Sequence, residues 1–526
     1  MNGFALLPAE IAAPTVEFRA LAPVLLVLAA ACLGILAEAV VPRAHRFLVQ
    51  VVLLVSSTVV SFGFLIANWR KGIGGPIAMG SIMLDGPTYF IWGSLLVLGL
   101  ISLLVFAERK LGGGASAFAA SAASVPGSVA ESEASAARLE HTEVFPLALF
   151  ALGGMMLFPA SSDLITMFIA LEVFSLPLYL MSGMARRRRL LSQEAALKYF
   201  LLGALSSAFF LFGVALLYAY SGSFDLSAIN AAVSGPIYGR GLMLTGMALL
   251  GIGLLFKVGV VPFHSWTPDV YMGAPTPVTG FMAICTKFAA VGATLRVFYV
   301  AFGGERWNWQ PMLAVLAVAT MLLGALLGLT QNDIKRTLAY SSIAHAGFIL
   351  TAIVGANAGT PTGQLTSVGS AMFYLVAYGF ATIGSFAIIT LVRNAGGEVN
   401  SISGWSGLGR KSPWLAGAFA FFMLSFAGIP LTGGFIGKWA VFASAWRGQY
   451  AWLVLTAVLL SLVAAYFYLR IVVVMFFGDA ADGVEIGNAS AFTLVPVAIC
   501  VAGVAVLGVA PGPLLDLAST AGTFLR

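Results

Sequence analysis

Charged residues are scarce in this sequence, and their scarcity excludes most classes of protein. They make up 9% of the 526 residues, whereas 60% are hydrophobic, and the mean hydropathy is +0.98. Soluble globular proteins carry about 25% charged residues. Apolar runs of about 20 residues, long enough for a helix to cross a membrane, recur from about Leu21 to about Val509, and we count about 14 of them. We therefore predict an all-α polytopic membrane protein.

Cysteine is also rare, which bears on cofactors. Cys32, Cys285 and Cys500 lie far apart in apolar runs, without the Cys-x-x-Cys spacing of zinc and iron–sulfur sites. The sequence also lacks a Gly-x-Gly-x-x-Gly segment followed by an acidic ribose ligand. We expect no disulfide, no metal site and no redox cofactor in this chain.

The basic residues are unevenly distributed between the two sides of the membrane. If the N-terminus lies outside and the spans alternate, fifteen Lys and Arg fall on the cytoplasmic side, seven outside and five within spans. The positive-inside rule then predicts both termini on the outer side. The net charge of +6 is thus explained by membrane orientation rather than by nucleic-acid binding. The preference for Arg and the richness in Ala and Gly are typical of a bacterial chain, so we expect the bacterial plasma membrane.

Three pairs of landmarks indicate a weak internal repeat. The pairs are Asp163 and Asp333, Tyr199 and Tyr374, and Pro262 and Pro430, separated by 170, 175 and 168 residues. Each unit would hold five spans, an odd number, so the second copy would cross the membrane in the opposite direction. Proline or glycine breaks at matching positions of inverted repeats indicate a transport site. The alternative is chance similarity among apolar helices.

These features divide the chain into five segments. The predicted segments are three N-terminal transmembrane helices in residues 1–107, a flexible low-complexity cytoplasmic loop in 108–143, a first five-helix repeat in 144–301, a second, inverted five-helix repeat in 309–477, and a C-terminal loop with the last transmembrane helix in 478–526. We favour a solvated loop over a partner-binding segment because residues 108–143 are mostly small and polar.

Ionisable residues inside the expected spans are the candidate functional residues. They are Glu172, Lys198, Lys257, Lys287, Arg296, His345 and Lys438. A charge at bilayer depth costs several kcal/mol and needs a partner, a water-filled cavity or a function. The chain has 19 Arg and 8 Lys, yet the spans hold four Lys and one Arg. Because a desolvated ammonium can lose its proton and a guanidinium cannot, we interpret the buried lysines as groups that titrate.

A structural role competes with each functional one. Lys198 could snorkel to the membrane interface, Arg296 favours an anchor or a structural ion pair, and His345 could simply hydrogen-bond in a packed interior. Glu172 and Lys257 are expected to form a proton switch, because contact between them favours the ammonium and separation releases its proton.

Two proline-containing stretches predict broken helices. In FKVGVVPFHSWTPD, Pro262 follows Lys257 and would free backbone carbonyls near the lysine. In SFAGIPLTGGFIGKW the order is reversed, with the break at Pro430 before Lys438. Lys287 would link one half to the other.

Longer tracts carry a family resemblance. FKVGVVPFHSWTPDVYMGAPTPVTGF, DIKRTLAYSSIAHAGF and AGIPLTGGFIGKW resemble the antiporter-like subunits of respiratory complex I, the proton-pumping NADH-quinone oxidoreductase. The likeness runs from about Glu143 to about Phe477. Within that family, the WTPDVYMGAPTPVT and ALKYFLLGALSSAFFLFG tracts and Lys438 are most similar to the N subunit, since the M subunit usually carries glutamate at the last position and the L subunit is longer.

The resemblance implies roles for individual residues. Glu172 and Lys257 would be the half-channel pair, Lys287 the central relay, His345 a polar link and Lys438 the site of the second half. It also implies that flavin, iron–sulfur clusters and quinone bind other subunits, and that the partners are membrane and peripheral subunits of complex I.

Three other functions were weighed against proton translocation. They are a subunit of an Mrp-type cation/proton antiporter, a structural membrane scaffold, and an intramembrane enzyme that uses His264 and Asp269. The last is disfavoured because no nucleophile or metal-ligand set accompanies these two residues, which we expect to cap the broken helix.

Overall fold

The structure is a computed structural model that describes residues 16–112, 116–121, 124–125, 128–137, 139–235, 239–356 and 365–525. Its α-helices are α1 (Phe18–Val40), α2 (Arg43–Arg70), α3 (Gly86–Leu104), α4 (Val129–Ala136), α5 (Val144–Ala160), α6 (Leu164–Ser182), α7 (Arg189–Ser221), α8 (Leu226–Val233), α9 (Arg240–Val258), α10 (Trp266–Gly273), α11 (Thr276–Arg296), α12 (Arg306–Leu329), α13 (Ile334–Val354), α14 (Ser367–Ile389), α15 (Leu408–Lys411), α16 (Pro413–Ala427), α17 (Gly433–Arg447), α18 (Ala451–Phe477), α19 (Ala491–Val509) and α20 (Gly512–Thr520).

The remaining elements are short. Strands β1 (Gly75–Ile77) and β2 (Ile82–Leu84) form an antiparallel hairpin, and β4 (Gly397–Glu398), β3 (Val392–Asn394) and β5 (Glu485–Ile486) form a small three-stranded sheet in that order. Five further helical turns are η1 (Val105–Ala107), η2 (Lys110–Gly112), η3 (Val297–Ala301), η4 (Gly303–Glu305) and η5 (Ile402–Trp405).

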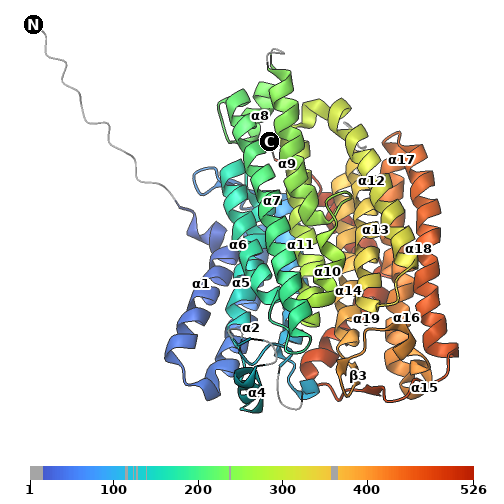
Figure 1. The fold of residues 1–526 in the computed structure, drawn as a ribbon. Coiled ribbons are helices and arrows are strands. Elements are labelled where there is room, and N and C mark those ends of the chain that lie inside the picture. The colour runs from blue at the N-terminus through green and yellow to red at the C-terminus, as the bar shows by residue number, and fades with distance from the viewer. Residues whose placement is uncertain are drawn as a thin grey trace, which may run out of the picture.

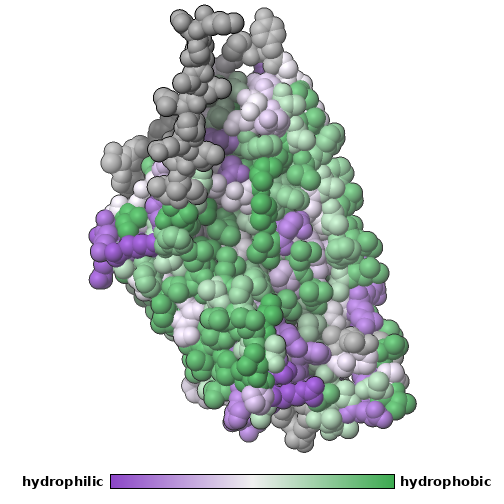
Figure 2. All heavy atoms as spheres, turned by 90° about the vertical axis from the view of Figure 1, so that its left-hand side faces the viewer, coloured by the Kyte–Doolittle hydropathy of each residue, from purple (hydrophilic) through white to green (hydrophobic). Residues whose placement is uncertain are grey.

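The helices form one bundle that suits a membrane. Twelve described helices are long and apolar enough to cross it, and α5 and α16 are apolar but shorter. Figure 1 shows the long helices side by side, and Figure 2 shows a broad hydrophobic surface on one face, with a hydrophilic cluster at its lower end. The predicted polytopic helical fold is confirmed, whereas the count of fourteen spans stays a prediction.

The centre of the bundle is formed by α11, α13 and α14. Every residue of α11 is buried, as is nearly every residue of α13 and α14, and Figure 1 places these helices between the earlier and later parts of the chain. A helix that is buried on all sides carries no solvent-facing or lipid-facing stripe. Polar residues on these helices therefore need partners inside the protein.

The two halves begin their spans in the same way. Asp163 caps α6 by accepting hydrogen bonds from the backbone N–H of Ile165 and Thr166, at 2.9 and 2.8 Å. Asp333 caps α13 by accepting from the N–H of Arg336 at 3.0 Å. An Asp side chain at this position satisfies amides that the first helical turn leaves unpaired. The Asp landmarks of the repeat are thus matching helix caps.

The two broken helices also end alike. α9 stops at Gly259 and α16 at Gly428, and both glycines have a φ of +83°, in the left-handed region that glycine adopts without steric cost. Figure 1 shows that α9 runs down from α8 toward α10, whereas α16 runs up from α15 toward α17. The breaks therefore point in opposite directions, as an inverted repeat requires.

The described part of segment 108–143 makes specific contacts. Phe118 is buried and forms an isolated bridge with Ala185, and the guanidinium of Arg186 donates to the carbonyls of Ser116 and Phe118 at 3.0 and 2.9 Å. At Phe118 the chain is packed rather than solvated. Residues 113–115, 122–123, 126–127 and 138 of the predicted loop lie outside the described residues.

Glu108 ties the start of this segment to the C-terminal part of the chain. Its carboxylate accepts hydrogen bonds from the hydroxyls of Ser490 and Thr493 and from the N–H of Lys110, at 2.7 to 2.8 Å. Burial opposes the ionisation of Glu108, but these hydrogen bonds outweigh it and lower the pKa of the carboxyl group. An ionised Glu108 thereby holds the start of α19.

Candidate functional site

Lys257 lies at the end of α9, where the first helix breaks. Its side chain is 1% exposed and its ammonium donates a hydrogen bond to the hydroxyl of Tyr179 on α6, at 3.1 Å. The ammonium nitrogen also lies 5.1 to 5.7 Å from the centres of four aromatic rings, those of Phe174, Tyr179, Tyr199 and Phe256. Aromatic faces attract a cation without removing its proton. Lys257 therefore sits in an aromatic cage with one polar partner.

Glu172 does not form the expected contact with Lys257. Its carboxylate accepts a hydrogen bond from the hydroxyl of Ser207 on α7 at 2.5 Å, and the described residues include no ion pair between Glu172 and Lys257. Glu172 and Tyr179 lie seven residues apart on α6, about two helical turns along one face. The pair predicted from the sequence thus forms no ion pair in this structure, and the Lys257 ammonium contacts Tyr179.

The carbonyl of Phe256, near the end of the first broken helix, accepts hydrogen bonds from Gly259 and Trp266 rather than from Lys257. The indole N–H of Trp266 donates to this carbonyl at 3.0 Å. The Trp266 ring stacks on Tyr199, with ring centroids 4.6 Å apart and an interplanar angle of 7°. The segment after the break is therefore fastened to the cage around Lys257.

Three buried polar atoms near this break have no hydrogen-bond partner among the described residues. They are the Tyr199 hydroxyl, the Thr267 hydroxyl and Nδ1 of His264. Buried polar groups are normally paired with protein or with ordered water. The surroundings of the first break are therefore suited to bind water.

Lys287 lies at the centre of the molecule on α11. Its ammonium donates to both the carbonyl and the hydroxyl of Ser342 on α13, and lies 5.5 Å from the ring centre of Tyr378. The Ser342 hydroxyl is in turn 3.4 Å from the hydroxyl of Tyr271 on α10. α10 thus contacts the Lys257 cage through Trp266 and the Lys287 site through Tyr271.

His345 is one helical turn beyond Ser342 on α13. Its Nδ1 hydrogen-bonds to the hydroxyl of Tyr374 on α14, and its Nε2 lies 3.2 Å from the hydroxyl of Tyr468 on α18. The imidazole ring is also 4.6 Å from the ring of Tyr378, whose centre lies 5.5 Å from the Lys287 ammonium. Both imidazole nitrogens are therefore engaged, so His345 can accept a proton at one nitrogen and donate at the other.

Lys438 lies on α17, beyond the second break. Its ammonium donates to the carbonyls of Phe426 and Ala427 at 2.8 and 3.0 Å and to the hydroxyl of Ser461 at 2.7 Å. The two carbonyls are the last of α16, where the helix dipole favours a positive charge. Here the break does present carbonyls to the lysine, as the sequence predicted for the other half.

Lys198 lies away from this row of residues. Its ammonium forms ion pairs of 2.7 Å with Asp269 and Glu194, and its side chain is 42% exposed. Asp269 also pairs with Arg336 at 3.2 Å, so it connects α7, α10 and α13 and does not cap α10 as expected. The contacts of Lys198 fit the structural alternative stated above.

Other cations are buried at the ends of helices, Arg296 and Lys335 among them. The guanidinium of Arg296 pairs with Asp85 at 2.8 Å, and both side chains are at most 2% exposed, which fits the structural ion pair expected for Arg296. Lys335, near the start of α13, is buried and donates to the carbonyl of Ala274 at 2.8 Å.

Sequence reasoning missed the neutral residues that surround Glu172, His345 and the buried lysines. They are Tyr179, Tyr271, Tyr374, Tyr378, Tyr468, Ser207, Ser342 and Ser461. A tyrosine in an apolar helix resembles any packed aromatic residue in a sequence. The available signal was their clustering, since five of these eight residues lie on α13, α14 or α18.

Comparisons with known proteins agree with this architecture. The family model described as NADH:quinone oxidoreductase/Mrp antiporter, TM, matches residues 161–464. The NADH-quinone oxidoreductase subunit N of Nocardioides sp. is 55% identical, with 98% of this chain and 99% of the relative covered. That of Acidothermus cellulolyticus is 53% identical, with 99% and 98% covered. The chain belongs to the subunit N family of NADH-quinone oxidoreductases. The resemblance inferred from the sequence motifs is thereby confirmed.

Solved structures show how far the family fold extends. A chain of respiratory complex I from Thermus thermophilus with bound aureothin is 31% identical, with a TM-score of 0.75, and the match covers 95% of this chain and 100% of that one. A chain of the Mrp complex from Dietzia sp. is 20% identical with a TM-score of 0.77, covering 96% and 97%. The second likeness shows only a common fold.

Proposed function

We propose that the chain is a proton-translocating membrane-arm subunit of NADH-quinone oxidoreductase, driven by quinone reduction elsewhere in that complex. One observation carries the proposal: Lys257, Lys287 and Lys438 are buried, and their hydrogen bonds among the described residues go to neutral oxygen atoms rather than carboxylates. A purely structural buried cation needs a countercharge, as Arg296 has in Asp85. A cation that must release its proton is better placed beside neutral groups.

The geometry supports a proton path in three steps. In the first half, Glu172 and Lys257 would exchange a proton when Glu172 leaves Ser207, with Tyr179 beside the ammonium. In the centre, a proton on Lys287 would pass along α13 by way of Ser342 and His345. In the second half, Lys438 would receive it.

The Tyr199 hydroxyl supplies a place for a water molecule in the first half. It belongs to one of the four rings around the Lys257 ammonium, is buried, and has no hydrogen-bond partner among the described residues. Water bound there would connect the cage to α10.

The energy for this movement would come from neighbouring subunits. We expect flavin, iron–sulfur clusters and quinone on those subunits, and no redox step in this chain. The bacterial plasma membrane, with both termini on the outer side, is the location that the charge distribution and the bacterial relatives favour.

Replacing Lys257 with methionine tests the proposal. The change keeps the apolar bulk but removes the proton-carrying group, so we expect proton pumping and quinone-coupled turnover to fall at least about tenfold. NADH oxidation with an artificial acceptor should be unchanged, because that reaction needs no proton path. Lys110→Met, at an exposed position outside this row of residues, is the matched control. Normal pumping in Lys257→Met would remove this lysine from the mechanism.

A subunit of an Mrp-type antiporter is the second candidate, because the Mrp chain from Dietzia sp. shares the fold. Isolating the native complex decides between them. Flavin and iron–sulfur absorption alongside this chain supports the first function, and small membrane subunits alone support the second. A structural scaffold would be established if a variant with Glu172, Lys257, Lys287 and Lys438 all neutralised still pumped normally.

A further inference from the structure

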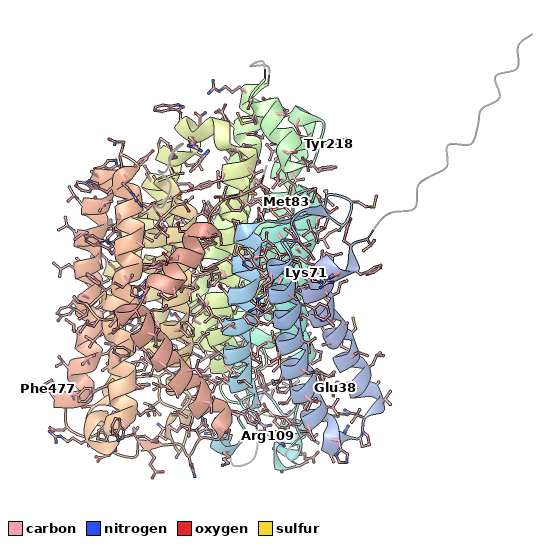
Figure 3. All side chains as sticks on the ribbon, turned by 180° about the vertical axis from the view of Figure 1, so that it is seen from behind. Glu38, Lys71, Met83, Arg109, Tyr218 and Phe477 are labelled. Carbon is pink, nitrogen blue, oxygen red and sulfur yellow. The ribbon has the colours of Figure 1, made fainter. Side chains whose placement is uncertain are left out.

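An apolar cavity of about 650 Å³ lies between helices from the N-terminal and C-terminal parts of the chain. It is bounded by α2 and α3 from the N-terminal part and by α14, α19 and α20 from the second half and C-terminus. Its wall is almost wholly apolar, with Phe62, Val97, Phe380 and Val506 among the larger side chains. Figure 3 shows α2 and α3, in blue, beside the dark red C-terminal helices.

Small residues on facing helices create this space. Gly93 and Ser94 line it from α3, and Ala502 and Gly503 from α19. Ala502 is exposed, so the cavity opens toward the membrane at that position. In a bilayer, an apolar hollow of this kind is accessible to lipid.

One end of the cavity is surrounded by residue types that are typical of the membrane interface. Trp69 and Tyr89 line it there, with ring centroids 5.2 Å apart, and the Tyr89 hydroxyl donates to the carbonyl of Ile73 at 2.6 Å. Trp and Tyr prefer the level of the lipid head groups. Arg70 and Lys71 follow Trp69 directly at the end of α2, and both are exposed. Lys71 is labelled in Figure 3.

The chemistry of the cavity and of its rim favours a lipid as the occupant. A hydrocarbon chain is thin and flexible enough to enter. The apolar interior, the aromatic rim and the two cations beyond it follow the order of groups along a phospholipid.

We infer that this cavity is a phospholipid-binding site, in which an acyl chain occupies the apolar interior and the phosphate lies near Arg70 and Lys71. Asp516 is an exposed acid on α20, whose end lies against Gly86 at the start of α3, so the rim keeps an excess of positive charge. The bound lipid joins α2 and α3 to α19 and α20 where side chains leave a gap.

Photo-crosslinking tests this site in the intact complex. The membrane complex containing the chain is reconstituted in vesicles with phosphatidylglycerol that carries a diazirine in the middle of one acyl chain. We expect labelled peptides from residues 89–98 and 499–507. In Ala502→Trp, the indole displaces at least two methylene groups of the lipid, so labelling should fall about tenfold. Arg70→Gln combined with Lys71→Gln should reduce labelling by phosphatidylglycerol more than by the zwitterionic phosphatidylethanolamine probe.

Ala498→Trp is the matched control, because Ala498 is exposed on the same helix one turn earlier and does not line the cavity. It should label like the unaltered chain. Equal labelling in Ala502→Trp and Ala498→Trp would overturn the inference. So would cross-links that join these peptides to another subunit in place of lipid.

Discussion

The two broken helices place one lysine each, but they surround it differently. Lys257 precedes its break and has four aromatic rings and one hydroxyl around its ammonium. Lys438 follows its break and donates to two helix-terminal carbonyls and one hydroxyl. The second site therefore offers its ammonium more hydrogen-bond acceptors than the first.

This difference follows from the inversion itself. Side chains on a helix point toward its N-terminus, so a lysine just before a break points back along its own helix, away from the freed carbonyls. A lysine just after a break points back toward them. Reversing the order of break and lysine thus changes the ligands of the ammonium, even though Gly259 and Gly428 have the same backbone conformation.

The largest contrast is expected from arginine at the two positions. Lys257→Arg and Lys438→Arg should each lower proton pumping at least about tenfold, because a guanidinium does not release its proton. The two variants should differ in the amount of complex that assembles. The Lys257 cage offers one hydroxyl to five N–H donors, and each buried unpaired donor costs about 1–3 kcal/mol, whereas the Lys438 site offers three acceptors.

Native gels with in-gel NADH oxidation measure this difference. The amount of assembled complex should fall in Lys257→Arg and stay near normal in Lys438→Arg. The Lys257→Met and Lys438→Met variants are the controls. They remove the charge of the lysine without adding N–H groups that need acceptors. Equal amounts of assembled complex in the two arginine variants would show that both sites accommodate a guanidinium equally well.

Much of this arrangement was accessible from the sequence, and what was missed has a physical cause. Apolar runs predicted the membrane helices, and the positions of Pro262 and Pro430 predicted the breaks, because each signal depends only on local chain chemistry. The partners of the lysines depend on which faces of distant helices meet. We therefore paired Lys257 with Glu172, the one acidic residue expected inside the spans, whereas in the structure the Lys257 ammonium contacts Tyr179 and Glu172 accepts from Ser207.

An intermediate contrast is expected from removing one hydroxyl at each site. Tyr179→Phe deletes the one hydrogen-bond acceptor of Lys257 among the described residues, and a hydrogen bond to a charged group contributes about 1.5–3 kcal/mol. Quinone-coupled proton pumping should fall about tenfold. Ser461→Ala deletes one of three acceptors of Lys438, so pumping should stay within about twofold.

Proton uptake by vesicles, measured with a fluorescent dye, gives both rates. Tyr218→Phe, at an exposed tyrosine near the end of α7, controls for loss of a hydroxyl. A larger fall in proton pumping in Ser461→Ala than in Tyr179→Phe would contradict the expected difference between the two sites.

The smallest contrast is expected at the two glycines that end the broken helices. A left-handed backbone costs a residue other than glycine about 1–2 kcal/mol, and this strain is common to Gly259→Ala and Gly428→Ala. At Gly428, however, an added methyl group would lie 2.9 Å from Cδ of Lys438, whereas at Gly259 it would meet only the Thr267 hydroxyl at 3.2 Å. Gly428→Ala should therefore displace the lysine and lower pumping a few-fold more than Gly259→Ala does.

Gly417→Ala within α16 is the control, because its methyl group would meet nothing within 4 Å. Since the strain is shared, any difference between the two variants reports how closely each break holds its lysine, and equal pumping would mean that the contact between Gly428 and Lys438 has no part in transport.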